Sequence, residues 1–154
     1  PNIKVEAIED KLDMDSMKEI AKSTDVIIDC SDNFYTRYAL NQIAYDLKKP
    51  LVSGAAIKFE GQLSVFDLTS EVSPCYECLF PDAKDEQELR CADHGVFSPL
   101  VGMIGTAQAA ETIKILLSIG SPLVGKLATL DIKTMRWQTF IVKKDPHCKV
   151  CGTH

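Results

Sequence analysis

Two Cys-x-x-Cys pairs constrain this chain more than any other feature of its sequence. The first pair is Cys75 and Cys78, and the second is Cys148 and Cys151. Each short spacing lets two thiolates converge on one ion, so the two pairs together match a tetrahedral four-cysteine zinc site. Because 69 residues separate the pairs, the site is predicted to hold a mid-chain loop against the C-terminal tail rather than to form an autonomous zinc finger.

Disulfides and a redox-active dithiol are the alternative interpretations of the cysteines. The residues from Pro1 to Glu6 lack the charged-then-apolar form of a secretory signal, so an oxidising compartment is not supported and we expect a cytoplasmic protein. A thioredoxin-like dithiol would stand alone near the start of a βαβ unit. Four thiolates leave no open coordination position, which predicts a structural zinc with His147 as a surface neighbour.

Size and composition exclude several classes of protein. The chain has 154 residues, the length of one domain, and 45% of them are hydrophobic, which argues against disorder. Its net charge of −5 argues against a nucleic-acid partner. We find no uninterrupted run of about 20 apolar residues, so no membrane span is expected.

The hydrophobic pattern predicts alternating helices and strands, and therefore an α/β fold. A strand, a helix and a second strand near the start form a βαβ crossover, in which the two strands are parallel. The predicted segments, in chain order, are a helix at 15–22, strands at 26–30, 51–53 and 62–68 with a helix at 34–48 between the first two, a helix at 98–119 capped by Gly120, and a hairpin of 127–132 and 136–142.

Small residues make one stretch of the last predicted helix thin. Gly102 and Gly105 lie there, together with Ala107, Ala109 and Ala110. We expect a sheet or another helix to pack closely against this stretch.

The first candidate ligand site is Asp29-Cys30-Ser31-Asp32-Asn33-x-x-x-Arg37, where a predicted parallel strand ends and a helix begins. Ligands collect at the carboxyl ends of strands in open α/β sheets. Asp32 could bind Mg²⁺ there, and Arg37, one turn on, could face a phosphate or a carboxylate. On local sequence a second interpretation stays open, in which Ser31 or Asp32 caps the helix and Arg37 is a surface residue.

Cys91 is the second candidate, because it belongs to neither pair and follows a polar, acidic segment at 81–88 that we expect to be an exposed loop. Arg90 and His94 could stabilise its thiolate, as a nucleophile requires. An unreactive loop thiol is equally consistent with the local sequence. Cys30, which ends an apolar strand, is predicted to be buried and inert.

These segments, taken in order, resemble the ThiF/MoeB/HesA family, the bacterial relatives of ubiquitin-activating enzymes. The segment from Asp29 to Arg37 resembles the D-x-x-D-N-x-x-x-R signature of that family, and the likeness runs from about Thr24 to Gly152. The other matching segments are Pro50-Leu51-Val52-Ser53-Gly54-Ala55-Ala56, Glu60-Gly61-Gln62, Pro74-Cys75-Tyr76-Glu77-Cys78-Leu79, Gly95-Val96-Phe97-Ser98-Pro99-Leu100-Val101-Gly102, Gly105-Thr106-x-Gln108-Ala109-x-Glu111-x-x-Lys114 and Cys148-x-x-Cys151-Gly152.

The resemblance implies an ATP- and Mg²⁺-dependent adenylyltransferase. Such an enzyme activates the C-terminal glycine of a ubiquitin-fold sulfur carrier in thiamine or molybdopterin sulfur transfer, and a sulfur donor then attacks the adenylate. Asp32 matches the family's catalytic metal and nucleotide aspartate, with Asn33 and Arg37 as its neighbours. Cys91 matches the cysteine that forms a covalent link in the thiamine branch. The four paired cysteines match the family's zinc ligands, and a homodimer is implied.

One part of the family pattern is missing, because the chain contains no G-x-G-x-x-G phosphate-binding loop. We therefore expect residues 1–154 to be a single domain equivalent to the C-terminal portion of an adenylation domain, inactive by itself. Its fold would be a partial doubly wound Rossmann-like sheet with a C-terminal antiparallel hairpin. The alternative function is a non-catalytic, zinc-stapled protein-binding module, and a redox dithiol protein is a third.

Overall fold

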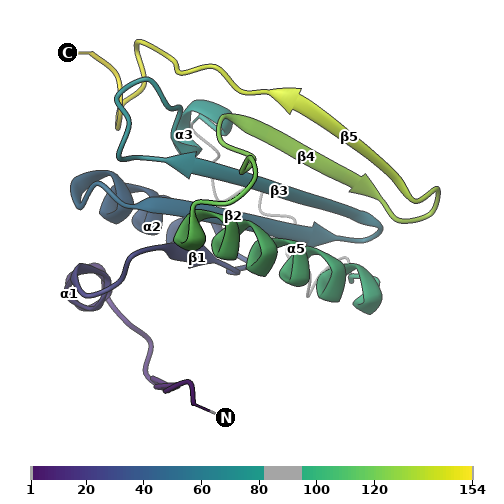
Figure 1. Cartoon of the computed structure of the whole chain (residues 1–154), viewed down its shortest axis with the longest axis horizontal. Helices are drawn as coiled ribbons and strands as arrows, with labels where there is room; N and C mark the ends of the chain where they lie inside the picture. The colour runs from purple at the N-terminus through teal and green to yellow at the C-terminus, as the bar shows by residue number, and fades with distance from the viewer. Residues whose placement is uncertain (1, 82–94, 154) are drawn as a thin grey trace.

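A mixed five-stranded sheet of order β1-β2-β3-β4-β5 forms the centre of the computed structural model, which describes residues 2–81 and 95–153 (Figure 1). The strands are β1 (Ile27–Asp29), β2 (Pro50–Ile57), β3 (Glu60–Asp67), β4 (Lys126–Asp131) and β5 (Arg136–Ile141). The helices are α1 (Met14–Lys22), α2 (Phe34–Asp46), α3 (Tyr76–Leu79) and α5 (Ser98–Leu117).

The predicted βαβ unit is confirmed. Strand β1 pairs in parallel with β2, with Ile28 opposite Val52, and α2 connects the two strands. The remaining strands pair antiparallel, and β4 and β5 form the predicted C-terminal hairpin. The predicted α/β class is therefore correct. Strand β2 is longer than expected because it pairs with β3 along its whole length, beyond the three residues that pair with β1.

Successive residues of β2 and β3 contribute their side chains to two apolar layers, one on each face of the sheet. Leu51 and Phe66 are opposite one another in the β2–β3 register and belong to the cluster that also contains Ile43 of α2. Their neighbours Val52 and Val65 belong to a different cluster, against which residues of α5 pack. Helices α2 and α3 thus cover one face of the sheet, and α5 covers the other.

The expectation of close packing against the thin stretch of α5 is wrong for its glycines. Gly102 and Gly105 are exposed, and a Cβ atom added to either would meet nothing within 4 Å. The close approach is instead at glycines of the sheet. A Cβ on Gly61 would lie 2.6 Å from Ile104 Cδ1, and one on Gly54 would lie 2.4 Å from Gln108 Cδ. The helix also ends earlier than predicted, at a left-handed Ser118 (φ 52°) rather than at Gly120.

The outer side of α5 is apolar and exposed, with Ile113, Leu116 and Leu117 each more than half accessible. By length and composition alone, α5 is the one helix in the described part of the chain that could cross a membrane. The test is weak evidence for a membrane span, since core helices of globular proteins also pass it, and α5 covers the sheet here.

Candidate functional site

Asp29, the last residue of β1, organises the loop that follows. Its carboxylate is 1% exposed. Oδ1 accepts hydrogen bonds from the Ser31 backbone N–H (2.9 Å) and hydroxyl (2.6 Å), and Oδ2 accepts from the Ser53 hydroxyl (3.0 Å). A buried carboxylate must be satisfied in this way to stay charged. Asp29 therefore fixes the loop between β1 and α2 onto β2 at Ser53.

Arg37 is the cation that accompanies this buried carboxylate. Its Nη1 atom lies 3.4 Å from Asp29 Oδ2 and 3.4 Å from the Gly54 carbonyl oxygen, and its Nη2 donates to the Ser31 carbonyl. The residue is 8% exposed, so the interpretation of Arg37 as a surface residue is wrong. The sequence predicted that Arg37 faces a phosphate or a carboxylate, and within the chain its guanidinium faces the carboxylate of Asp29.

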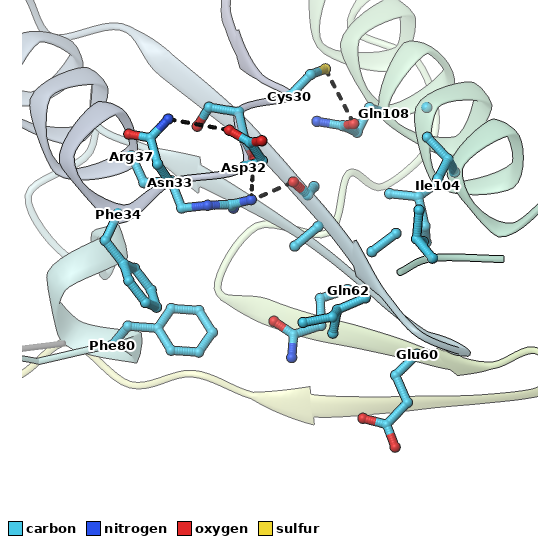
Figure 2. Close-up of a pocket in the computed structure, with 18 of the residues that line it drawn as sticks. Cys30, Asp32, Asn33, Phe34, Arg37, Glu60, Gln62, Phe80, Ile104 and Gln108 are labelled. Carbon is cyan, nitrogen blue, oxygen red and sulfur yellow. Dashed lines mark hydrogen bonds between the residues drawn. The ribbon is translucent and has the colours of Figure 1, made fainter. Parts of the chain in front are cut away.

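Asn33 caps α2, which leaves Asp32 available for another role. The Asn33 side-chain oxygen accepts the Thr36 N–H at 2.8 Å, the usual N-cap bond, so neither Ser31 nor Asp32 is the cap. Asp32 is exposed, and the Asn33 Nδ2 atom lies 3.4 Å from its Oδ1. Its carboxylate is presented at the N-terminus of the helix, where Figure 2 shows it beside Asn33.

A cavity of about 540 Å³ opens next to this loop. It is lined by Ser31 to Phe34, by Gly54 to Ile57 of β2, and by Ile104 and Gln108 of α5 (Figure 2). Its volume lies within the range of small-molecule sites, and its mostly apolar wall with a few polar groups is typical of them. The cavity is located at the carboxyl end of the parallel strand β1, where ligands collect in α/β sheets.

Cys30 lines the cavity and is exposed, so the prediction that it is buried is wrong. The alternation of the strand places Asp29 on the buried side and Cys30 on the other. The Cys30 Sγ lies 3.4 Å from Gln108 Oε1, and Gln108 Nε2 donates to the Asp29 carbonyl at 2.8 Å. Asp29 and Gln108 were not predicted as site residues; the signals were an acid ending an apolar strand and an amide in an apolar helix.

Cys30 should react with iodoacetamide more slowly at neutral pH than an ordinary thiol. Partial burial first, and the Asp29 carboxylate second, raise its pKa above the ordinary cysteine value. A raised pKa lowers the thiolate fraction at neutral pH, and the thiolate is the nucleophile. Peptide mass spectrometry after timed labelling should therefore show that the labelling rate of Cys30 still increases at pH values above the ordinary thiol pKa. The same residue in urea serves as the control, and matching pH profiles would contradict the prediction.

Cys91 lies outside the described residues, as do Arg90, His94 and positions 82–88 of the predicted loop. The described chain resumes at Gly95, whose carbonyl accepts the Lys58 N–H at 3.0 Å, and Val96 lines the cavity.

The four paired cysteines converge in the structure. Cys75 and Cys78 lie at and within α3, and the other two lie in the tail that follows β5. The Sγ atoms are 3.9 Å apart for Cys75 and Cys78, 3.6 Å for Cys75 and Cys148, and 3.3 Å for Cys78 and Cys151. Four sulfurs at about 2.3 Å from a tetrahedral zinc would be about 3.8 Å apart, whereas a disulfide needs about 2.0 Å. The donor set therefore fits zinc.

The surroundings of the cluster favour thiolates that bind a cation. Burial raises the pKa of the Cys75 thiol to about 12 and also raises that of Cys151, so neither thiol loses its proton readily without a cation. Backbone donors point at the sulfurs: the Asp145 N–H lies 3.4 Å from Cys78 Sγ. Burial alone would raise the pKa of Cys148, but the backbone N–H groups of Cys151 and Val150 have a larger opposite effect, so the pKa is lowered. His147 is exposed.

The chain has an MccB-like α/β fold. Escherichia coli MccB, in a crystal structure with ATP, superposes with a TM-score of 0.71 over 94% of this chain and 44% of that chain, at 17% identity. A structure of PaaA gives a TM-score of 0.64 at 16% identity, over 86% of this chain and 46% of that chain. These likenesses show the fold alone. The chain belongs to the ThiF family, which matches residues 1–150.

Curated relatives support the family assignment over nearly the whole chain. The sulfur carrier protein adenylyltransferase of Thermus thermophilus is 42% identical over 99% of this chain and 58% of its own length. The molybdopterin-synthase adenylyltransferase of Salmonella typhimurium is 40% identical (99% and 60%), and the sulfur carrier protein ThiS adenylyltransferase of Escherichia coli is 38% identical (99% and 59%). The chain thus spans less than two thirds of the length of these relatives, and the predicted family resemblance is confirmed.

Proposed function

We propose that this chain is part of an ATP-dependent adenylyltransferase that activates the C-terminal glycine of a ubiquitin-like sulfur carrier protein. The observation that carries the proposal is the exposed Asp32 carboxylate at the mouth of a cavity of about 540 Å³, at the carboxyl end of β1. The names of the relatives supply the substrate class. We place the protein in the cytoplasm, as a homodimer that also meets a sulfur donor protein.

The chemistry requires a carboxylate, which is a poor electrophile, to become a mixed anhydride. A carboxylate oxygen of the carrier attacks the α-phosphorus of ATP, the bond to the bridging oxygen breaks, and pyrophosphate leaves. The sulfur donor then attacks the acyl carbon, and AMP leaves. Asp32 would hold Mg²⁺, which offsets charge on the phosphates. Asn33 fixes Asp32 by capping α2, and Arg37 fixes the loop through Asp29 and Ser31.

Cys91 is proposed as the residue that forms the covalent link to the carrier in a thiamine-like branch. Its support is the sequence, in which Arg90 and His94 can stabilise a thiolate. On this proposal Cys91 acts after adenylation, so the steps at phosphate belong to the Asp32 site.

The remaining proposals concern the metal and the extent of the chain. Cys75, Cys78, Cys148 and Cys151 would hold one structural Zn²⁺, supported by their mutual sulfur distances. Residues 1–154 would be a single domain equivalent to the C-terminal portion of the relatives. Without a G-x-G-x-x-G loop this chain would not by itself exchange pyrophosphate into ATP.

The test is a titration of the isotope-labelled chain with MgATP, followed by amide chemical shifts. Shifts are expected at the residues that line the cavity, and Asp32→Ala should reduce the affinity at least about tenfold, as loss of a metal ligand does. Asp25→Ala, an exposed acid at the opposite end of β1, is the matched control. Shifts elsewhere, or an Asp32→Ala chain that binds MgATP as tightly as the parent chain, would contradict the proposal.

A further inference from the structure

Asn41 is a fully buried side chain that is only half satisfied. It lies on α2 and is 0% exposed. Its Oδ1 atom accepts the Tyr76 backbone N–H at 2.9 Å. Its Nδ2 atom, like the Ser64 hydroxyl, is buried with no hydrogen-bond partner in the described part of the chain. Leaving a buried polar group unpaired costs free energy, so a partner is expected.

The orientation of this amide is fixed by Tyr76. Because the Tyr76 N–H can only donate, the atom that faces it must be the Asn41 oxygen, and a flipped amide would set two donors against each other. The Nδ2 donor is therefore the free end. Tyr76 directly follows Cys75, which is itself 0% exposed, so the free end lies in the neighbourhood of a sulfur that water does not reach.

The Cys75 sulfur is an acceptor within reach of this amide. The Asn41 oxygen is held 2.9 Å from the nitrogen of Tyr76, the residue that follows Cys75, so the other end of the same amide lies close to Cys75. A neutral thiol is a weak acceptor, whereas a thiolate is a strong one.

We propose that Asn41 is a positioning residue of the metal centre, whose Nδ2 donates an N–H···S hydrogen bond to the metal-bound Cys75 thiolate. The inference rests on the proposed four-cysteine metal site. Four thiolates around one divalent cation carry a net negative charge, which N–H donors offset. The Asp145 backbone N–H is such a donor to Cys78 from the tail, and on this proposal Asn41 supplies Cys75 with a donor from α2. Groups around metal ligands fix their orientation and basicity in this way.

The first test compares zinc affinities by competition with a chromophoric chelator. Asn41→Asp keeps the size of the side chain and the acceptor for Tyr76 but removes the donor, so zinc should bind about 10–100-fold more weakly. Ser64→Ala, on β3, removes a second buried polar atom that has no partner among the described residues and no contact with a cysteine sulfur that would be lost, and it should leave the affinity unchanged. Equal affinities for Asn41→Asp and the parent chain would overturn the proposal.

The second test uses the unmutated chain, because the buried carboxylate that Asn41→Asp introduces can also affect folding. In protein loaded with ¹¹³Cd, a through-hydrogen-bond coupling should connect the metal to the Asn41 side-chain amide protons. The backbone amides of Val150 and Cys151 provide the positive control. Coupling to those amides without coupling to Asn41 would overturn the role of Asn41 alone, whereas failure of the chain to bind cadmium or zinc would overturn the metal site with it.

Discussion

Removal of the metal from the four-cysteine cluster should cause the largest loss of stability of any change to this chain. Structural zinc contributes about 10–16 kcal/mol of apparent binding free energy in small zinc domains, and binding energy to the folded state is folding energy. Here the cluster belongs to the apolar core, since Cys75, Cys148 and Cys151 pack with Phe66 and Tyr76. Thermal unfolding followed by circular dichroism should move to a much lower temperature after chelation and return on addition of one equivalent of zinc.

Cysteine substitutions separate the metal from nonspecific effects of the chelator. Cys148→Ser should reproduce the loss and make the chain insensitive to chelator, because a ligand is gone. Cys30→Ser is the matched control, since Cys30 lies in the cavity rather than in the cluster, and its melting curve should keep the chelator response. Superimposable curves with and without chelator for the parent chain would contradict the prediction.

Arg37→Met should destabilise the chain by about 3–5 kcal/mol, the cost of breaking a buried ion pair by removing one partner. The Asp29 side chain is 1% exposed and would be left without its cation, and the Ser31 and Gly54 carbonyls would each lose a donor. Urea unfolding measures the loss. The comparison is Lys22→Met, which breaks the exposed pair of Lys22 with Glu19 and should cost less than about 1 kcal/mol.

A double variant identifies the cause of the loss at Arg37. If the cost comes from an uncompensated Asp29 charge, Asp29→Asn combined with Arg37→Met should be more stable than the sum of the two single losses predicts. Additive losses would instead assign the effect to lost packing of the arginine stem.

Local patterns predicted the elements and the clustering of the four cysteines well, for identifiable reasons. The Cys-x-x-Cys spacing requires no knowledge of the fold, because each short spacing already lets two thiolates converge on one ion. The run from Val26 to Cys30 indicated a strand, but its end could not reveal which side faced the core. Asp29 therefore went unrecognised as the buried acid, and Cys30 was predicted on the wrong side. The sequence also cannot show which side of a helix–sheet contact carries the small residues. Gly102 and Gly105 of the helix suggested a close contact, but the sheet glycines Gly54 and Gly61 are the ones that the helix approaches closely.

Asn41 illustrates the other limit of the sequence. In the sequence, Asn41 is one polar residue in a predicted helix. Its proposed role depends on Tyr76 and Cys75, which are distant in sequence and which the fold brings close to it. Long-range contacts of this kind carry no local signal.

The separation of the two cysteine pairs, 73 residues from Cys75 to Cys148, also sets an order on biosynthesis. A chain leaves the ribosome N-terminus first, so β1 to β3 and the first cysteine pair emerge long before the second pair. Until the tail arrives, Cys75 and the apolar face around Phe66 lack the residues that cover them. A translation product that stops before Cys148 is therefore marked by an open core and half a metal site, the kind of exposed surface that cellular proteases and chaperones act upon.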